Sequence, residues 1–255
     1  MTAALFDLSK RIALITGSSQ GIGYSLARGL AAAGATIVLN ARSKDKLETA
    51  AERLRAEGAT VHTAAFDVTD QGAVTSGIEE IESAIGPIDI LVNNAGIQRR
   101  MPLEDFPAET WDEVMRTNLD SVFFVGQAVA RHMIPRKHGK IINICSVQSE
   151  LGRPSIAPYS ASKGAVKMLT KGMAIDWGKH NIQVNGLGPG YFKTELTEAL
   201  VKDEAFTAWL VARTPSGRWG EVDELTGAAV FLASPASSFV NGHILYVDGG
   251  VTATL

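Results

Sequence analysis

Short runs of β-branched and other apolar residues alternate along the chain with longer segments that have a helical pattern. Apolar runs of this length, bounded by turn residues, are typical of strands that are buried in a sheet. The predicted strands are Arg11–Thr16, Thr36–Asn40, Val61–Ala65, Asp89–Val92, Lys140–Cys145, Gln183–Leu187 and Ile244–Val247. The predicted helices are Gly21–Ala33 and Asp45–Glu57, with others around 70–85, 109–134, 158–179 and 221–233.

This alternation of strands and helices indicates a parallel sheet. A parallel pair of strands needs a crossover of about a dozen residues or more, and the predicted helices provide crossovers of that length. Because such helices lie on both sides of the sheet, its strands are buried on both faces, which agrees with their continuous apolar runs. We therefore expect an α/β fold; the alternative is an α+β chain in which the alternation is coincidental.

The composition is that of a globular chain able to bury a sizeable core. Of its 255 residues, 45% are hydrophobic and 20% are charged, which excludes a disordered protein. There are 24 Lys and Arg residues and 27 Asp and Glu residues, so the net charge is -3. The chain therefore has no general attraction to nucleic acid or to an anionic membrane. No repeat or low-complexity linker divides it, and we expect a single domain over residues 1–255.

Cysteine, histidine and apolar content restrict the kinds of site and location that we expect. One cysteine permits no disulfide framework, and the five histidines have no metal-ligand spacing, so we expect no metal site. The longest unbroken apolar run, Ala228–Ala233, is far shorter than the ~20 residues that span a bilayer. The N-terminus reaches Asp7 before the apolar core of a signal peptide can form. We expect a cytoplasmic protein in a reducing environment.

Three glycines follow the first predicted strand and open the first helix. Their spacing, at Gly17, Gly21 and Gly23, is G-x-x-x-G-x-G. Glycines here let the backbone turn tightly and approach a pyrophosphate, and the following helix N-terminus offers free N–H groups to the anion. A plain tight turn is the alternative, but a position between a strand and a helix favours dinucleotide binding. The predicted cofactor contacts in this turn are Gly17, Ser19, Gln20, Gly21, Ile22 and Gly23.

The same residues also match a second motif. Gly17–Gly21 fits G-x-S-x-G, the turn that carries the nucleophile of many hydrolases. In that interpretation Ser19 is the nucleophile and a late histidine such as His243 is its base. Only 16 residues precede the turn, too few for the strands that normally come before such a nucleophile, and nothing in the sequence holds His243 near Ser19. A serine hydrolase is kept as an alternative from another class.

The end of the second predicted strand bears on the choice of nucleotide. An acidic residue there would accept hydrogen bonds from a ribose 2′-hydroxyl group and would repel a 2′-phosphate. The strand ends at Asn40, and no acid follows before Asp45. Arg42 can pair with a 2′-phosphate through two hydrogen bonds, so we predict NADP(H); the alternative is a solvated loop arginine. Asp67, after the third strand, is placed to accept from the adenine amino group or to cap the helix near Asp70.

A tyrosine and a lysine stand four residues apart on the predicted helix at 158–179. Tyr159 and Lys163 share one helical face, about 5–6 Å apart at Cβ. A free tyrosine has a pKa of about 10, and we expect the nearby ammonium to lower this pKa and give a proton donor and acceptor. Ser146 ends the fifth strand, where a hydroxyl group can hold a substrate carbonyl against the phenol. Cys145 should point to the other side and pack as a small apolar residue; a surface tyrosine and a solvated lysine are the alternative.

Taken together, these motifs resemble the short-chain dehydrogenase/reductase family over essentially the whole chain. The segments that carry the resemblance are Thr16–Gly23, Asn93–Gly96, Asn118, Ser146, Tyr159–Lys163, Pro189–Gly190 and Val247–Gly250. The resemblance implies an oxidoreductase with a single Rossmann-type domain, a seven-stranded parallel sheet with helices on both faces, and a homotetramer. A protein that only senses the nucleotide would need the glycine turn but not the serine, tyrosine and lysine together.

The resemblance also implies roles for individual residues. Tyr159 would be the general acid and base, and Lys163 would be its pKa partner and a ligand of the nicotinamide ribose. Ser146 would bind the carbonyl, and Asn118 would anchor a water molecule on the proton path. The remaining cofactor contacts would be Val68, Asn94, Ala95, Gly96, Pro189, Gly190 and Thr194.

Further segments resemble members of this family that act on sugar acids. They are Asn93–Arg100, Ile144–Leu151, Lys171–Ala174, Gly188–Phe192, Thr214–Gly220 and Phe239–Gly250. This likeness, and not the residue pattern, implies the reversible oxidation of D-gluconate to 5-keto-D-gluconate with NADP; another polyol or ketone is the alternative. Relatives that prefer NADP often carry a basic residue where this chain has Gln20, which leaves Arg42 as the main argument for that cofactor.

An acid substrate must be bound by individual basic residues, because the net charge of the chain as a whole is weakly negative. Neighbouring side chains of an extended segment point to opposite sides, so only one of Arg99 and Arg100 can face the crevice, and we favour Arg100. Arg153 is a further candidate for the carboxylate. Side chains in the loop after the fifth strand are suited to the hydroxyl groups of the substrate. The predicted substrate contacts are Arg100, Ser146, Gln148, Glu150, Arg153 and Tyr159.

Overall fold

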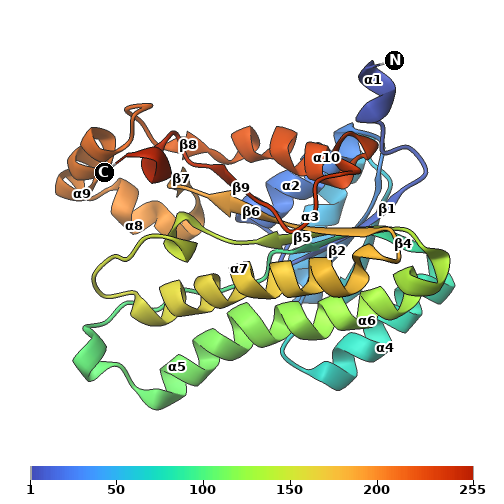
Figure 1. Cartoon of the computed structure of the whole chain (residues 1–255), viewed down its shortest axis with the longest axis horizontal. Helices are drawn as coiled ribbons and strands as arrows, with labels where there is room; N and C mark the ends of the chain where they lie inside the picture. Colours follow the sequence, from blue (N-terminus) through green and yellow to red (C-terminus); the bar gives the residue numbers. More distant parts are fainter. Residues whose placement is uncertain (1, 255) are drawn as a thin grey trace.

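Seven parallel strands form the centre of the protein. A computed structural model describes residues 2–254, in which the strand order is β3-β2-β1-β4-β5-β6-β9 (Figure 1). The strands of this sheet are β1 (Ile12–Thr16), β2 (Thr36–Ala41), β3 (Val61–Ala65), β4 (Ile88–Asn93), β5 (Gly139–Ile144), β6 (Ile182–Pro189) and β9 (Ile244–Val247); a separate short pair is β7 (Phe192–Lys193) and β8 (Gly220–Glu221). Every neighbouring pair in the large sheet is parallel, so the predicted fold class is confirmed.

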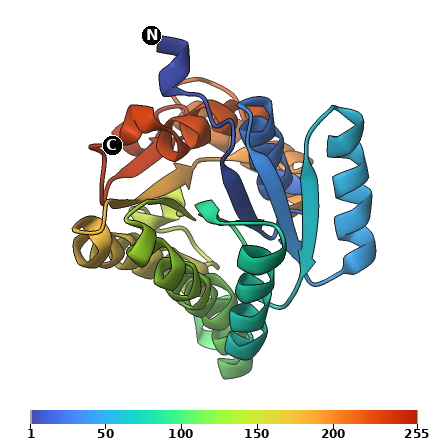
Figure 2. The same ribbon diagram turned by 90° about the vertical axis from the view of Figure 1, so that its right-hand side faces the viewer.

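Helices cover the sheet on both faces (Figures 1 and 2). They are α1 (Thr2–Leu5), α2 (Gly21–Ala32), α3 (Lys44–Ala56), α4 (Gln71–Ala84), α5 (Ala108–Met115), α6 (Ser121–Arg136), α7 (Ala157–Gly178), α8 (Glu198–Val201), α9 (Glu204–Arg213) and α10 (Thr226–Ala233). Successive residues of a strand face opposite sides. Ala13 and Ile15 share a core with α2, α3 and α10, whereas Leu14 shares the other core with α4, α6 and α7. None of the helices in residues 2–254 combines the length and the apolar character of a membrane span.

The strand boundaries of the large sheet agree with the sequence prediction to within two residues. Helix α1 and the short strands β7 and β8 were not predicted, and three further helical regions differ. The helix predicted at 109–134 is interrupted by a π-helical segment at 116–120, which separates α5 from α6. At 221–233, a 3-10 turn over 222–225 precedes α10. Helices α8 and α9, within residues 194–213, had no counterpart in the prediction. A single π turn inside a helix often lies at a functional site, and this one contains Asn118.

Because the strands are parallel, their carboxyl ends meet at one edge of the sheet. Strands β1 and β4 are neighbours, although the chain first runs outward through β2 and β3 and only then returns to β4. The connections that leave β1 and β4 therefore run in opposite directions, and a crevice opens between them at the carboxyl edge. The segment with α8 and α9 lies at the same edge, on the left of Figure 1. This edge is therefore the expected place of a ligand site.

Candidate active site

Two cavities open at the carboxyl edge of the sheet and meet at Tyr159. The larger has a volume of about 630 Å³ and extends from the glycine turn after β1 past the ends of β2 and β3. The smaller, of about 110 Å³, lies between the ends of β5 and β6 and the segment before α9. Ile22, Ile144, Tyr159 and Thr194 border both cavities. A long ligand in the first cavity and a small one in the second would therefore meet at this tyrosine.

The structure brings the predicted cofactor residues together, although they are far apart in the sequence. The larger cavity is bordered by Gly17, Ser19, Gln20, Gly21, Ile22, Gly23, Arg42, Asp67, Val68, Asn94, Ala95, Gly96, Tyr159, Lys163 and Thr194. The other two, Pro189 and Gly190, lie at the end of β6 and border the smaller cavity. The predicted residues thus surround a pair of adjoining cavities, while their contacts with a cofactor stay a prediction.

The glycine turn packs tightly against the loop after β4. Gly17 has a φ of +61°, and a Cβ atom at this position would lie 2.8 Å from Cα of Ala95. A Cβ atom at Gly23 would lie 2.5 Å from Nδ2 of Asn94. The same amide group donates hydrogen bonds to the carbonyl oxygens of Thr16 (2.9 Å) and Gly17 (3.0 Å). The two glycines therefore permit the close approach that holds the turn and the β4 loop together.

The N-terminus of α2 borders the larger cavity, and no side chain caps its first turn. Gln20 precedes the helix, and its side chain makes no capping hydrogen bond. The first N–H groups of a helix have no partner within the helix, so a bound anion can accept hydrogen bonds from them. Gly21 has a φ of +59°, and a Cβ atom there would project to 3.2 Å from Oε2 of Glu195. The lack of a side chain at Gly21 and the uncapped backbone fit the pyrophosphate of a dinucleotide.

Two cations lie at the far end of this cavity. The side chain of Arg42 is 79% exposed, and its NH1 atom lies 3.8 Å from Oδ2 of Asp67. Lys46, from the first turn of α3, borders the same end. An exposed arginine with one distant acidic neighbour is free to turn toward a phosphate group. Lys46 was not predicted; the available signal was the run of basic residues at 42, 44 and 46.

Asn40 offers this cavity a hydrogen-bond acceptor that the sequence analysis also did not include. Its Nδ2 atom donates to the carbonyl oxygens of Ala64 (2.9 Å) and Phe66 (3.2 Å). Its Oδ1 atom is buried and has no hydrogen-bond partner within residues 2–254. A buried polar atom without a partner is uncommon and often marks a ligand or ordered water. Asn40 stands at the end of β2, where an acidic residue would have favoured a ribose hydroxyl group.

Asp67 does not cap the helix that follows it. Its Oδ1 atom accepts hydrogen bonds from the backbone N (2.9 Å) and Oγ1 (2.7 Å) of Thr69. The cap of α4 is Asp70, whose Oδ1 atom accepts from two backbone N–H groups of the first turn. The capping alternative for Asp67 is therefore wrong. Its Oδ2 atom faces Arg42, and its contact with an adenine amino group stays a prediction.

Ser146, Tyr159 and Lys163 lie together where the two cavities meet. Ser146 follows β5 and is buried, and its Oγ atom accepts a hydrogen bond from the backbone N of Gln148 (3.1 Å). The nearby Ser146 hydroxyl group acts to lower the pKa of Tyr159. The Nζ atom of Lys163 donates to the carbonyl oxygen of Ile144 (2.7 Å) and lies 5.8 Å from the centre of the Tyr159 ring. The spacing of four residues on α7 thus places the phenol and the ammonium group on one helical face.

Burial determines the pKa values of this pair. It raises the pKa of Tyr159 above its ordinary value of 10.0, against the lowering effect of the Ser146 hydroxyl group. It also lowers the pKa of Lys163 to about 8. The expected lowering of the tyrosine pKa by Lys163 is not found in this structure, because burial disfavours the charged phenolate and is the largest influence on Tyr159. At neutral pH the tyrosine is a phenol that is able to donate a proton.

Asn118 connects the loop after β4 to α7. It lies in the π-helical segment and is fully buried. Its Oδ1 atom accepts from the backbone N of Ile97 (2.8 Å), and its Nδ2 atom donates to the carbonyl oxygen of Ile97 (2.9 Å) and to Oγ of Ser162 (3.0 Å). Ser162 precedes Lys163 on the helix, so Asn118 links the loop after β4 to the part of α7 that carries Lys163. Its role as the anchor of a water molecule stays a prediction.

Two arginines border the smaller cavity. Burial, together with the positive charge of Arg153, lowers the pKa of Arg100. The guanidinium group of Arg153 also lies 5.0 Å from the ring centre of Phe206. An anion between the two arginines would relieve their mutual repulsion. Arg99 is instead paired with Glu113, through Nε (3.1 Å) and Nη2 (2.7 Å), and borders the larger cavity. We expected only one of the two arginines to face the crevice; both border a cavity, and Arg100, the one we favoured, borders the smaller.

Gln148 presents a second unsatisfied acceptor to the smaller cavity. Its Nε2 atom donates to the hydroxyl group of Tyr191 (3.4 Å), whereas its Oε1 atom is buried without a partner in the described part of the chain. A buried polar atom without a partner costs about 1–3 kcal/mol, which a hydrogen bond from a ligand hydroxyl group would remove. Tyr191 packs against Phe206 and Trp219. The sequence analysis missed Tyr191, because it is not part of a chemical motif.

Glu150 borders neither of the two cavities. Its Oε1 atom accepts hydrogen bonds from Nζ of Lys167 and from the hydroxyl group of Tyr246 (2.8 Å). The hydrogen bond with Lys167 is the main reason why the pKa of Glu150 is lowered. The carboxylate is thus turned toward α7 and β9 and away from the reaction centre. The structure does not support the predicted substrate contact at Glu150, and we withdraw it.

The serine hydrolase alternative is excluded by the topology of the sheet. Ser19 follows the carboxyl end of β1, whereas His243 precedes the amino end of β9. In a parallel sheet these ends lie at opposite edges, so His243 cannot serve as a base for Ser19. Cys145, next to Ser146, is buried in the core with α4, α6 and α7, and burial raises its pKa to about 11. It packs as a small apolar residue, as predicted.

Known proteins match this chain over nearly its full length. A family model described as enoyl-(acyl carrier protein) reductase matches residues 17–252. Gluconate 5-dehydrogenase of Gluconobacter oxydans (strain 621H) is 65% identical over 251 residues, 98% of this chain and 98% of that protein. The 5-keto-D-gluconate 5-reductase of Escherichia coli (strain K12) is 59% identical over 247 residues, 97% of this chain and 97% of that protein.

A solved structure also matches the whole chain. It is the crystal structure of a gluconate 5-dehydrogenase from Burkholderia cenocepacia J2315 in complex with NADP and tartrate. The two structures have a TM-score of 0.98 and 62% sequence identity, and the match covers 100% of each chain. The similarity therefore extends to every element that forms the two cavities.

Proposed function

This chain belongs to the short-chain dehydrogenase/reductase family, and we propose that it transfers a hydride between NADP(H) and a sugar acid, interconverting D-gluconate and 5-keto-D-gluconate. The observation that carries this proposal is the meeting of the two cavities at Tyr159. One cavity has the backbone geometry for a dinucleotide, and the other has two arginines for a carboxylate. The relatives named above support both parts, since one of them is described as a gluconate 5-dehydrogenase that holds NADP and tartrate.

The larger cavity holds the cofactor by two kinds of contact. The uncapped backbone N–H groups at the start of α2 bind the pyrophosphate. Arg42 and Lys46 bind the 2′-phosphate, which distinguishes NADP(H) from NAD(H). Asn40 accepts a hydrogen bond from the nucleotide through its buried Oδ1 atom. Lys163 and Thr194 border the end near the reaction centre, where the nicotinamide lies.

The reaction centre moves a proton between the substrate and Tyr159. Bound NADP(H) supplies the hydride for reduction and accepts it in oxidation. In reduction, the Tyr159 phenol donates its proton to the substrate carbonyl oxygen while the Ser146 hydroxyl group donates a hydrogen bond to the same oxygen. In oxidation, the phenolate takes the proton from the C5 hydroxyl group. Because burial raises the pKa of Tyr159, its phenol form predominates at neutral pH, which suits the reductive direction.

The smaller cavity determines which carbon reacts. Arg100 and Arg153 hold the carboxylate at C1, and Gln148 accepts a hydrogen bond from a substrate hydroxyl group. Anchoring an acid at C1 places a carbon several bonds away beside Ser146 and Tyr159. In gluconate we assign C5 to this position. Glu150 takes no part, because its carboxylate is bound to Lys167 and Tyr246.

A substrate and cofactor panel tests the proposal. The purified protein is assayed with NADP and NAD against D-gluconate, 2-dehydro-3-deoxy-D-gluconate and an uncharged polyol, and kcat/KM is compared. We expect the highest value for gluconate with NADP. Turnover of the uncharged polyol with an equal kcat/KM would overturn the carboxylate site, and an equal kcat/KM with NAD would overturn the role of Arg42. No turnover of either acid would overturn the proposed substrate class.

A further inference from the structure

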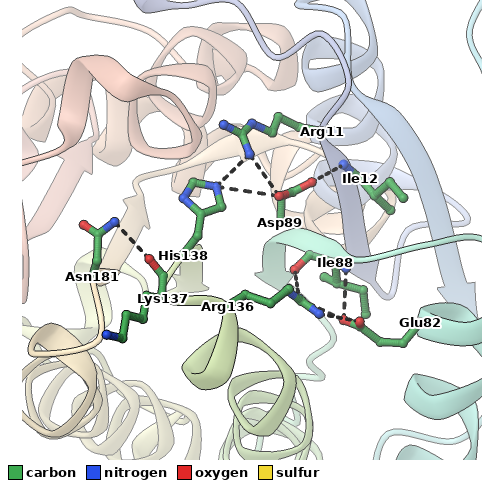
Figure 3. A network of polar contacts seen from close by, with 9 residues as sticks. All are labelled: Arg11, Ile12, Glu82, Ile88, Asp89, Arg136, Lys137, His138 and Asn181. Carbon is green, nitrogen blue, oxygen red and sulfur yellow. Dashed lines mark hydrogen bonds and ion pairs between the residues drawn. The ribbon is translucent and has the colours of Figure 1, made fainter.

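A third cavity lies at the amino edge of the sheet, opposite the two that form the reaction centre. It has a volume of about 140 Å³ and is bordered by residues of β4, β5 and β6, of the segments that precede β1, β5 and β6, and of the end of α10 and the turn after it. The polar side chains on its walls are Arg11, Asp89, His138, Lys140, Asn181, Gln183 and Ser238. Most of these residues belong to the network in Figure 3. Neither the cofactor nor the substrate proposed above reaches this edge, so these groups have no part in the reaction.

Lys140 is a buried cation without an acidic partner. It is 5% exposed, and its Nζ atom donates to Oγ of Ser237 (3.1 Å). Within residues 2–254, no carboxylate lies within ion-pair distance of this ammonium group. Burial lowers the pKa of Lys140 to about 8, and no nearby charge offsets this effect. Buried lysines are rare unless they are paired, because the charge loses its hydration. An anion in the adjoining cavity would supply the missing partner.

The charged groups of this cavity, with Lys140 included, carry a surplus of positive charge. Asp89 is the one carboxylate on its described walls. Its Oδ1 atom accepts from NH1 of Arg11 (3.1 Å), and its Oδ2 atom accepts from the backbone N of Ile12 (3.1 Å). The same NH1 atom lies 2.9 Å from Nε2 of His138 (Figure 3). Asp89 therefore compensates Arg11 and leaves the charge of Lys140 unbalanced.

The neighbouring acid does not supply the missing charge. Glu82 forms a pair of hydrogen bonds with Arg136, and it also accepts from the backbone N of Ile88 (3.0 Å) (Figure 3). It does not border the cavity. Because the charge of Glu82 is already compensated by Arg136, an anion has no acidic competitor on that side.

We propose that the cavity at the amino edge binds a small oxyanion of the phosphate class, held by Lys140 and Arg11. A tetrahedral oxyanion has several oxygens, which suits an ammonium group and a guanidinium group that approach from different sides. A neutral His138 accepts a hydrogen bond from Arg11 through Nε2. The same Nε2 atom lies 3.6 Å from Oδ1 of Asp89, so a protonated His138 would pair with that carboxylate. Asn181 and Gln183, which are hydrogen-bonded to each other at 3.3 Å, close the cavity on the side of β6.

Phosphate titration by isothermal calorimetry tests this proposal. The protein is first saturated with NADP, so that inorganic phosphate cannot occupy the 2′-phosphate position near Arg42. We expect saturable binding of one phosphate, which Lys140→Met weakens by about tenfold or more, because a charge-assisted contact is lost. The matched control is Lys171→Met, which removes the same charge from the exposed face of α7; it should leave the affinity unchanged within twofold.

Two further variants separate this site from the substrate cavity and from a folding defect. Arg100→Ala should leave phosphate binding unchanged, and loss of binding in this variant would overturn the proposal. Arg11→Gln alters a half-exposed side chain, so the variant keeps the fold and should weaken phosphate binding severalfold. Absence of saturable binding, or equal affinity in the unmodified protein, Lys140→Met and Arg11→Gln, would also overturn it.

Discussion

The two cavities at the carboxyl edge are built in different ways. The larger takes its walls from strand ends, from the glycine turn and from the start of α2, all of which the sheet holds in place. Asn94 holds the loop after β4 against the glycine turn, because its side chain donates hydrogen bonds to two carbonyl oxygens of the turn. The smaller cavity also borders the ends of β5 and β6, but the polar groups that distinguish it are side chains on loops, such as Arg100, Arg153 and Tyr191. The larger cavity thus depends mainly on backbone geometry, whereas the smaller cavity depends on side chains that come from separate segments.

This difference explains why a cofactor site is easier to find in a sequence than a substrate site. A backbone that approaches a pyrophosphate requires glycine at fixed positions, so the requirement is visible as a motif. A carboxylate can be bound by any arginine whose long side chain reaches it, so no spacing is required. Substitutions in the first site should therefore alter cofactor use for every substrate, and substitutions in the second should discriminate between substrates.

The largest effect is expected at Tyr159, where the two cavities meet. Tyr159→Phe removes the hydroxyl group and leaves the ring in place, so we expect kcat to fall ~10²–10⁴-fold, the usual contribution of acid–base catalysis. The dissociation constant for NADPH, measured by fluorescence titration, should stay within twofold. The control is Tyr191→Phe, which removes a hydroxyl group that accepts a hydrogen bond from Gln148. Near-normal kcat in Tyr159→Phe would show that the meeting point of the cavities is not the reaction centre.

A smaller effect is expected at the far end of the larger cavity. Arg42→Asp replaces the cation near the 2′-phosphate with a like charge, so the ratio of kcat/KM for NADP to that for NAD should fall roughly ten- to a hundredfold. The matched control, Arg53→Asp, makes the same change in charge on the exposed face of α3. An unchanged ratio in Arg42→Asp would mean that the cavity does not select the cofactor at this end.

Two adjacent arginines give a further test, because Arg100 borders the smaller cavity and Arg99 borders the larger. Arg100→Ala should raise KM for gluconate by about tenfold, because one charge-assisted contact is lost, and should leave KM for an uncharged ketone nearly unchanged. Arg99→Ala is the control, since Arg99 is paired with Glu113. If Arg100→Ala weakens both substrates equally, its role is structural and the carboxylate is held elsewhere.

The smallest effect is expected at Glu150. Glu150→Gln removes an ion pair with Lys167 that lies outside both cavities, and such partly exposed pairs are worth about 0.2–1 kcal/mol. We expect kcat/KM for gluconate to change by less than about threefold. Gln148→Leu, two residues earlier, removes an acceptor inside the cavity and should have the larger effect. A greater loss of kcat/KM in Glu150→Gln than in Gln148→Leu would show that Glu150 does contact the substrate.

The sequence predicted the elements whose formation depends on local pattern. Apolar runs identified all strands of the large sheet, because buried parallel strands need continuous apolar residues. The π-helical turn around Asn118 was not foreseen, since its side chain bonds to Ile97 and Ser162, which are distant in the sequence. Helices α8 and α9 were missed because they lie over the cavities and carry no long amphipathic period.

In the site, the residues were easier to predict than their environment. Tyr159 and Lys163 follow from a spacing, but their pKa values depend on burial, which only the assembled fold determines. The 3-10 turn after Ser146 turns Gln148 into the smaller cavity and Glu150 away from it, and the sequence contains no rule for that direction. Asn40 and Tyr191 act through their position alone, so no residue pattern indicated them.

The central claim is that C5 of a sugar acid lies beside Tyr159 and exchanges its hydride with NADP. D-Gluconate labelled with deuterium at C5 is oxidised with NADP, and the NADPH and the product are analysed by mass spectrometry. The account predicts that deuterium appears in NADPH, that gluconate labelled at C2 keeps its deuterium in the product, and that Tyr159→Phe nearly abolishes the transfer. Formation of unlabelled NADPH from the C5-labelled substrate, or transfer from C2, would contradict it.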